Sequence, residues 1–371
     1  MMSARFLTVV LERAFNMRDG FGREIDYMRI SVIDSCNLNC YYCNPCDNNE
    51  HCHALNILSV KEVLCIVRAA TRLGIKHFRL TGGEPLLHPQ LDEMVLQIKK
   101  IPGVSSVSLT TNAVLLAQHA KWLKEAGIDS INVSLDTIDA SEYERITKKP
   151  LLEEVKHGIN AAIECGIRVK INVVLTPQTD VVALTRYVAK KGTDIRFIEM
   201  MPVGEGHTNG VEPYKKVIGT LSKLYGEPCR INTEKIKEIN SGNDKRKIPD
   251  NGPAEYYIFP ELGIRVGLIQ AIHGKFCDTC NRIRVTADGR LMPCLGSSVT
   301  MDLVPDSWDF ADDVEKDFAI VRALRAAIKA KPRCHNFNDN AVTYTKTTET
   351  KTTEIEAAEV NAARNMSRIG G

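Results

Sequence analysis

The sequence predicts an α/β fold, in the form of an open, partial (β/α)6 TIM-like barrel followed by a C-terminal extension. The first observation behind this prediction is that apolar, strand-like runs alternate with amphipathic helical patterns up to residue 203. Such alternation is typical of βα units joined into a parallel sheet. The second is that only six such units are present, fewer than the eight of a closed barrel. The barrel should therefore have a wide mouth at the carboxyl ends of its strands, where an active site is expected.

The expected strands and helices of the barrel alternate along the chain. The strands are Met28–Ile33, His77–Thr81, Val104–Thr110, Ser130–Leu135, Arg168–Leu175 and Ile195–Met200. Between them, apolar residues recur at helical spacing. These helices are Val60–Leu73 with Ser59 as its N-cap, Gln90–Lys100, Leu115–Ala126, Glu153–Cys165 and Asp180–Lys191.

The pattern changes after residue 203. A helix over Pro213–Tyr225 is followed by a lysine-rich loop near Ser241–Lys247, short β-like pieces and a helix over residues 314–330. Residues 343–354 are rich in Thr, Lys and Glu and lack apolar side chains, which predicts a flexible linker before a weak helical pattern at Ile355–Ala363. We expect three parts: the partial barrel (1–203), an extension that covers the open barrel (204–342), and the linker with its tail (343–371).

Composition and charge exclude several classes of protein. The 371 residues are 44% hydrophobic and 25% charged, with a formal charge of +2, which is ordinary for a soluble globular protein. No apolar run approaches the ~18 residues that span a bilayer, and residues 1–18 fit a short amphipathic helix better than a transit peptide. The near-neutral charge speaks against a nucleic-acid partner. Twelve cysteines, many without a partner, indicate a reducing compartment, so we expect a cytoplasmic protein.

Three cysteines form the pattern C-x3-C-x2-C just after the first strand. They are Cys36, Cys40 and Cys43, with the aromatic Tyr42 before the third. Three thiolates can hold three irons of a four-iron cluster and leave the fourth iron open to a ligand. The alternative is a zinc knuckle or scattered structural thiols, because zinc sites use similar spacings.

This pattern resembles the radical S-adenosylmethionine superfamily. The resemblance implies a [4Fe-4S] cluster whose open iron chelates S-adenosylmethionine and whose electron cleaves the sulfonium to give a 5′-deoxyadenosyl radical. In such an enzyme the cofactor carries the difficult chemistry, and the protein supplies binding and orientation.

A second set of three thiols lies near the other end of the chain. Cys277 and Cys280 form C-x2-C, and Cys294 follows. A zinc ribbon would need a fourth ligand, for which His273 or Cys334 is available. The alternative is a second [4Fe-4S] cluster with its own open iron, facing the first across a cavity. Of the other cysteines, Cys65 and Cys165 fit buried hydrophobes, and Cys46 and Cys52 fit exposed spare thiols.

Longer motifs narrow the resemblance. The run from Phe276 to Leu291 with Cys294-Leu295, the opening Asp19-Gly20-Phe21-Gly22-Arg23 and the terminal Gly370-Gly371 resemble the GTP 3′,8-cyclase family of molybdenum cofactor biosynthesis. The chain departs from the usual family pattern at Ser35, His77, Phe78, Ala113 and the loop after Cys43. These departures concern peripheral contacts and leave both cysteine sets intact.

Several strand ends are expected to bind S-adenosylmethionine. Thr81-Gly82-Gly83-Glu84-Pro85 ends the second strand, and paired glycines let a backbone approach a ligand closely. Glu84 can accept hydrogen bonds from a cationic amine, and the alternative is a tight strand-to-helix turn. The resemblance implies cofactor contacts by Tyr42, Gly82, Gly83, Glu84, Thr111 and Ser134.

Cations on the strands predict an anion site. A cation inside an apolar strand is costly unless it is paired or faces a polar cavity. Arginine binds phosphate oxygens in bidentate fashion, so several such cations together suit a triphosphate. We expect one or two of them to pair with Glu199 or Asp136. By resemblance, the GTP contacts are Arg29, Arg79, Lys170, Arg196, Asn281, Arg282 and Arg284.

The resemblance implies a radical lyase that converts GTP to 3′,8-cyclo-7,8-dihydro-GTP, the first step of molybdenum cofactor biosynthesis. The second cluster would hold the guanine base, and the residues that take part in catalysis would be Gly370, Gly371, Arg282 and Arg284. Implied partners are a flavodoxin- or ferredoxin-like electron donor and a downstream cyclic pyranopterin monophosphate synthase, with a homodimer as one option for assembly. The alternatives are a radical enzyme that matures a peptide or protein and a zinc-stabilised binding module.

Overall fold

Six parallel strands in sequence order form the centre of the sheet. The computed structural model describes residues 17–43, 56–203, 210–231, 252–297, 299–303, 313–335 and 337. The central strands are β1 (Tyr27–Ser31), β2 (His77–Thr81), β3 (Ser106–Thr111), β4 (Ser130–Ser134), β5 (Val169–Leu175) and β6 (Asp194–Glu199). The predicted six-stranded parallel core is confirmed, and its strand bounds differ from expectation by at most two residues.

Strands from the C-terminal part of the chain lengthen this sheet at both edges. At one edge β10 (Arg282–Val285) pairs in parallel with β1 and leads to β11 (Arg290–Met292) and β12 (Met301–Asp302). At the other edge β9 (Arg265–Ile269) pairs in parallel with β6 and leads to β8 (Glu255–Ile258) and β7 (Cys229–Arg230). The described strands form one open sheet of twelve in the order β12-β11-β10-β1-β2-β3-β4-β5-β6-β9-β8-β7. The sequence predicted a covering extension but not this pairing at the two edges.

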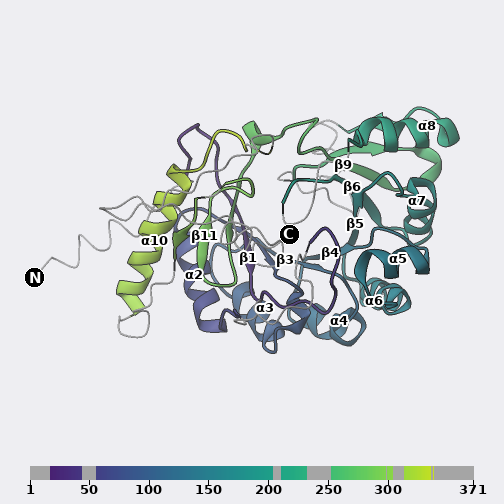
Figure 1. Ribbon diagram of the computed structural model, residues 1–371. Helices are drawn as coiled ribbons and strands as arrows, with labels where there is room; N and C mark the ends of the chain where they lie inside the picture. Colours follow the sequence, from purple (N-terminus) through teal and green to yellow (C-terminus); the bar gives the residue numbers. More distant parts are fainter. Residues whose placement is uncertain are drawn as a thin grey trace, which may run out of the picture.

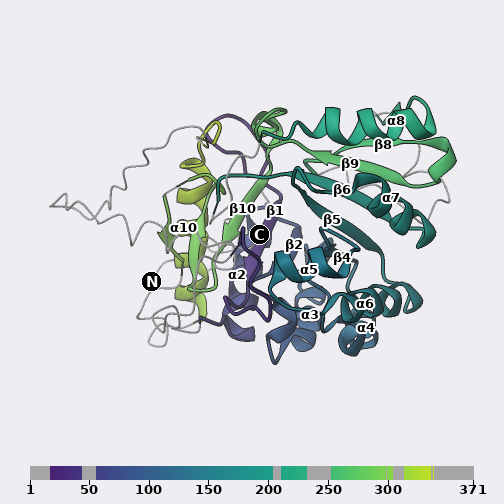
Figure 2. The same ribbon diagram turned by 45° about the vertical axis from the view of Figure 1, so that its right-hand side comes forward.

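Helices range along the outer side of the curved sheet (Figures 1 and 2). They are α2 (Val60–Arg72), α3 (Leu91–Lys99), α4 (Leu116–Glu125), α5 (Ala140–Thr147), α6 (Leu152–Glu164), α7 (Val181–Lys190), α8 (Gly219–Tyr225) and α10 (Asp313–Lys329). Ser59 caps α2 as predicted: its hydroxyl accepts from the Glu62 amide, and the Glu62 carboxylate accepts from the Ser59 amide in return. The expected helix at 213–225 consists of a π-helical turn (Tyr214–Ile218) and α8.

Helix α5 was not predicted. Asp139 is its N-cap and accepts a 2.8 Å hydrogen bond from the amide of Glu142. Only Tyr143, Ile146 and Thr147 are buried, so the apolar face is too short to give a clear helical period. The Asp139 cap was the available sequence signal.

Helix α10 ties the end of the described chain to its beginning. It lies beside α2 (Figure 1), and Arg72 of α2 forms a 2.7 Å ion pair with Asp317 of α10. Ile320, Leu324 and Ile328 of α10 are fully buried. This packing brings Lys331, just after α10, against Arg282 of β10 and Pro293, which follows β11.

Candidate active site

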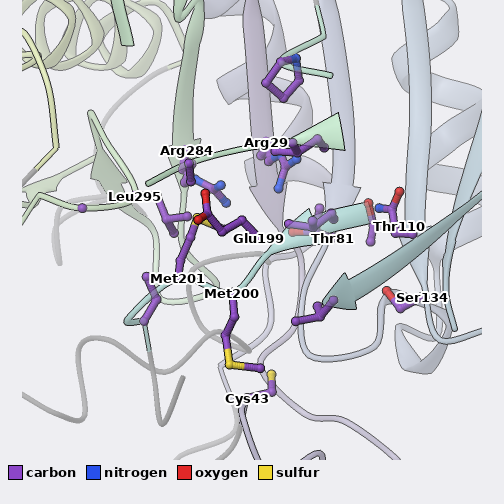
Figure 3. A pocket seen from close by; sticks show the side chains of 18 of the residues that line it. Arg29, Cys43, Thr81, Thr110, Ser134, Glu199, Met200, Met201, Arg284 and Leu295 are labelled. Atoms are coloured by element: carbon purple, nitrogen blue, oxygen red, sulfur yellow. The ribbon is translucent and has the colours of Figure 1, made fainter. Parts of the chain in front are cut away.

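One cavity of about 290 Å³ opens at the carboxyl ends of the strands, where a partial barrel places its site. All six predicted cluster cysteines line it, so the fold brings together two sets of thiols from opposite ends of the chain: Cys36, Cys40, Cys43, Cys277, Cys280 and Cys294. None of the six is in a disulfide. Figure 3 shows Thr81, Ser134 and Glu199 around the pocket, with Arg29 and Arg284 at the top of the view and Cys43 at the bottom.

The first cysteine set is held by the backbone around it. The amide of Leu38 and the side chain of Asn112 donate to the Cys36 sulfur, at 3.5 and 3.7 Å. Burial raises the pKa of the Cys36 thiol to about 11 and that of Cys43 to about 12. Cysteine binds metal as the thiolate, so the proton must leave when a metal binds. Because these thiols hold their protons tightly, they suit a strongly positive metal group, such as the irons of a cluster.

No three His, Cys, Asp or Glu side chains come close enough to hold a single metal ion, as far as the described part of the chain extends. Neither His273 nor Cys334, the candidates for a fourth zinc ligand, lies on the cavity wall. His273 is hydrogen-bonded to Glu199, and Cys334 is exposed. The donor set, two groups of three thiols around one cavity, fits two multi-iron clusters better than a four-ligand zinc site.

The paired glycines after β2 allow two backbones to touch. A Cβ on Gly82 would lie 2.3 Å from the carbonyl oxygen of Ile33, and one on Gly83 would lie 2.2 Å from that of Ser35. The amides of Gly83 and Glu84 donate to the carbonyls of Ile33 and Ser35, at 2.8 and 2.7 Å. The close approach that sequence reasoning assigned to a ligand is thus made to the protein's own strand end, directly before Cys36. Both glycines also line the cavity.

Glu84 lies behind the cavity wall and organises the end of β3. Its carboxylate accepts hydrogen bonds from the Thr111 hydroxyl (2.7 Å) and from the amides of Asn112 (2.7 Å) and Leu86 (3.0 Å). Complete burial raises the pKa of Glu84 to about 7. Thr111, which Glu84 orients, does line the cavity.

Ala113, where the family usually has glycine, has a φ of +65°. This left-handed backbone conformation costs glycine nothing and an alanine about 1–2 kcal/mol, which explains the usual glycine physically. Its amide donates to the Thr111 hydroxyl at 2.9 Å, so the turn remains tied to the strand end.

Tyr42 and Asp136 form a half-buried, hydrogen-bonded pair on the wall beside the first cysteine set. The Tyr42 hydroxyl donates to Asp136 Oδ2 at 2.5 Å, and the amide of Val174 donates to Oδ1 at 2.8 Å. Burial raises the pKa of Asp136 to about 6. Sequence reasoning saw Asp136 only as a partner for a cation; its position just after β4 was the signal that it belongs to the site.

The predicted cations gather on the inner face of the sheet in two levels. Arg29, Arg282 and Arg284 line the cavity, whereas Arg79, Lys170 and Arg196 are buried outside its wall. The register places Arg284, Arg29 and Arg79 side by side on β10, β1 and β2. Asn281 also lies off the wall, where its side chain donates to Asp26 at 2.7 Å.

These cations are poorly compensated by acids. Burial and the neighbouring Arg284 lower the pKa of Arg29 well below its usual value, and burial and Arg196 do the same to Lys170. Two buried guanidinium atoms, Arg29 Nε and Arg196 Nη2, have no hydrogen-bond partner among the described residues. The arrangement leaves a positive potential that an anion would neutralise.

We expected one or two of these cations to pair with Asp136 or Glu199. In the described residues, both carboxylates bind other groups. Asp136 binds Tyr42, and Glu199 binds the ring and amide of His273 together with the amide of Ile272. Arg79 instead donates to the hydroxyl of Tyr27 and the carbonyl of Leu109. Although burial opposes it, the charges of Arg79 and Arg29 lower the pKa of Tyr27 to about 8.

Some predicted features lie outside the described residues: Gly370, Gly371, Cys46, Cys52, residues 1–16 of the helix expected at 1–18, the loop at 241–247, and residues 343–363. Sequence reasoning also missed site residues that the structure shows on the cavity wall. They are Asn112, Asn172, Lys331 and His335. No helix that the structure describes has the length and apolar character needed to cross a bilayer.

Two sequence families match the chain in succession. Residues 30–183 match the radical SAM superfamily, and residues 193–337 match the family described as Molybdenum Cofactor Synthesis C. The "GTP 3′,8-cyclase" of Clostridium perfringens (strain SM101) is 35% identical over 324 residues, which cover 86% of this chain and 95% of that protein. The protein of the same name from Petrotoga mobilis is 35% identical over 331 residues, covering 87% and 96%.

Solved structures share the fold at low sequence identity. Streptococcus suis SuiB bound to S-adenosylmethionine superposes with a TM-score of 0.51 at 15% identity, covering 80% of this chain and 68% of that one. The protein anSMEcpe with bound AdoMet superposes with a TM-score of 0.51 at 17% identity, covering 82% and 84%.

Proposed function

Because this chain belongs to the GTP 3′,8-cyclase family within the radical S-adenosylmethionine superfamily, we propose that it converts GTP to 3′,8-cyclo-7,8-dihydro-GTP, the first step of molybdenum cofactor biosynthesis. The superfamily uses a [4Fe-4S] cluster and S-adenosylmethionine. The observation that carries the proposal is that both cysteine sets and three arginines, Arg29, Arg282 and Arg284, line one cavity.

We assign the first cluster to Cys36, Cys40 and Cys43, and a second cluster to Cys277, Cys280 and Cys294. When bound, the first cluster and S-adenosylmethionine supply the radical that removes the 3′ hydrogen of the ribose. Support for the cofactor site comes from Tyr42, Gly82, Gly83, Thr111 and Ser134, which all line the cavity. Glu84 acts in this proposal through Thr111 and Asn112, because both its oxygens already accept hydrogen bonds from the protein.

The protein's own groups hold and orient the substrate. Arg29, Arg282 and Arg284 face the cavity and would bind the triphosphate, with Arg79, Lys170 and Arg196 adding positive potential from behind. Ring closure joins two parts of one molecule, and holding ribose and base in the reactive geometry would remove most of the remaining entropic cost. A neutral peptide substrate, as in the maturase alternative, would leave this cluster of cations uncompensated.

The test is anaerobic reconstitution with iron and sulfide, followed by reductant, S-adenosylmethionine and GTP, with products identified by mass spectrometry. We expect 5′-deoxyadenosine together with a cyclised isomer of GTP. 5′-Deoxyadenosine without GTP conversion would direct the search to another substrate. Neither product, in a sample that carries iron, would favour a binding module.

The variant Cys294→Ser tests the second cluster, with the exposed Cys229→Ser as the matched control. Cys294→Ser should lose cyclisation while Cys229→Ser keeps it. Near wild-type cyclisation by Cys294→Ser would show that the second cysteine set does not hold the substrate.

The catalytic roles of Gly370 and Gly371 remain a prediction from the family resemblance. Deleting both should abolish cyclisation and leave the iron content unchanged; unchanged turnover would contradict it. The electron donor, the downstream synthase, the homodimer and the cytoplasmic location likewise stay predictions.

A further inference from the structure

Residues 331–335, here called the strap, contact the segments that carry Cys280 and Cys294 of the second set. The strap follows α10 and runs along the cavity, with Lys331 and His335 on its wall. Nothing in the reaction proposed above uses these residues.

Lys331 is a buried ammonium whose contacts all belong to the second cysteine set. Its side chain is 2% exposed. It donates to the carbonyl of Arg282 at 2.8 Å and to that of Pro293, the residue before Cys294, at 2.9 Å. Lys331 and Cys280 both line the cavity. An ammonium has three N–H donors, and the two carbonyls accept two of them.

No carboxylate of the described residues forms an ion pair with Lys331. An ammonium buried without a negative partner costs several kcal/mol. The negative charge available beside it is that of the thiolates on the cavity wall. The site is therefore complete only when Cys280 and its neighbours carry negative charge, as they do when they ligate a metal cluster.

The other end of the strap is held just as firmly. The His335 ring lies 2.8 Å from the carbonyl oxygen of Ala271. From the opposite side, buried Arg23 donates to the carbonyls of Cys277 (2.6 Å), Pro332 (2.6 Å) and Arg333 (2.9 Å). Arg23 is itself paired with Asp19 at 2.6 Å. The strap cannot shift without moving the cysteine segments.

We propose that Lys331 is a positioning residue that supplies the fixed counter-charge of the second cysteine set, holding the Cys280 and Cys294 segments and raising the reduction potential of the cluster bound there. A nearby positive charge and a hydrogen bond to a ligating sulfur both stabilise the more negative, reduced state of an iron–sulfur cluster. The inference rests on the second cluster proposed above.

The experiment uses the full chain with Cys36, Cys40 and Cys43 replaced by Ser, so that only the second set can hold a cluster. Into this parent are placed Lys331→Met, which removes the charge, Lys331→Gln, which keeps amide donors, and Lys331→Arg, which keeps the charge. Lys329→Met is the matched control, because Lys329 is exposed two residues away. Iron and sulfide per chain and an EPR-monitored redox titration are the readouts.

We expect Lys331→Met and Lys331→Gln to shift the midpoint potential to more negative values, or to lower the iron content, while Lys331→Arg and Lys329→Met match the parent. Full iron content with an unshifted potential in both neutral variants would overturn the proposal. Equal loss in Lys331→Arg and Lys331→Met would also overturn it, since shape rather than charge would then matter. A parent that binds no iron would instead refute the second cluster itself and this inference with it.

Discussion

At the scale of single residues, the protein maintains buried groups whose ionised forms the fold itself disfavours. The sheet register stacks Arg284, Arg29 and Arg79 side by side, where like charges repel across neighbouring strands. A bound anion would neutralise these charges, whereas the ligand-free protein bears their repulsion. The arginines therefore favour ligand binding and lower the stability of the free protein.

Arg29→Met tests that opposition. Removing a cation whose buried Nε has no hydrogen-bond partner among the described residues should raise the free energy of unfolding of the ligand-free protein by about 1–3 kcal/mol. The same change should weaken GTP binding, measured by equilibrium dialysis alongside urea unfolding. Arg186→Met, an exposed arginine on α7, should alter neither quantity. A destabilised Arg29→Met would mean that the cation is already compensated in the free protein.

The raised pKa of Glu84 predicts that the free energy of unfolding depends on pH. Its folded pKa of about 7 lies above the ordinary 4.5, so the folded state binds the proton more tightly than the unfolded state does. Stability of the metal-free protein should therefore be greatest near pH 5 and should fall by about 1–3 kcal/mol as the pH rises to 7. Asp136, with a pKa of about 6, adds a smaller loss with the same sign.

The measurement is urea unfolding at pH 5, 6 and 7 for the wild type and Glu84→Gln. The variant should show a flatter pH dependence, whatever its absolute stability. An identical slope in both proteins would show that Glu84 is ionised throughout this range.

At the scale of elements, the turn after β2 is built to lie against the strand end that carries the first cysteines. Both glycines are required by contact with the carbonyls of residues 33–35. This contact fixes the start of the cysteine loop before any metal binds, which preorganises the ligands.

Gly83→Ala should disrupt that element. The added Cβ would meet backbone oxygens at 2.2 and 2.4 Å, so the two chains must separate, at a cost of about 1–3 kcal/mol. Iron content at the first cysteine set should fall with it. In the control, Gly219→Ala, no atom lies within 4 Å and the residue is helical, so stability should rise by about 0.5–1 kcal/mol. Iron loading and stability of wild-type level in Gly83→Ala would contradict the role given to this turn.

At the scale of the whole molecule, the barrel and the C-terminal part share one sheet. β9 and β10 cover the edges of β6 and β1, and they carry or adjoin Arg282, Arg284 and Cys280 of the cavity wall. The boundary predicted at residue 203 therefore marks a change in the sequence pattern, but strands from both sides of it pair in the same sheet.

A fragment of residues 1–203 tests that dependence. It would expose two unpaired strand edges and the apolar face under α10, so we expect aggregation or no cooperative thermal unfolding. Residues 1–342, which lack only the predicted linker and tail, should unfold cooperatively like the full chain. Sedimentation and circular dichroism measure both outcomes, and a monomeric, cooperatively unfolding 1–203 would refute the expectation.

The sequence by itself determined the local features of this protein. Alternating periodicity located six strands and most helices within a few residues, and cysteine spacing identified two candidate metal sites, because both signals arise from neighbours along the chain. Only the tertiary structure decided how distant segments meet. Asn281 reaches Asp26 across 255 residues, and Lys331 lies against the carbonyl of Arg282 and the carbonyl before Cys294. Long-range packing decides that β9 and β10 pair with the edges of the central sheet. It also decides that Glu84 lies behind the cavity wall and that Lys331 is buried. Contacts of this kind leave no periodic pattern in the sequence.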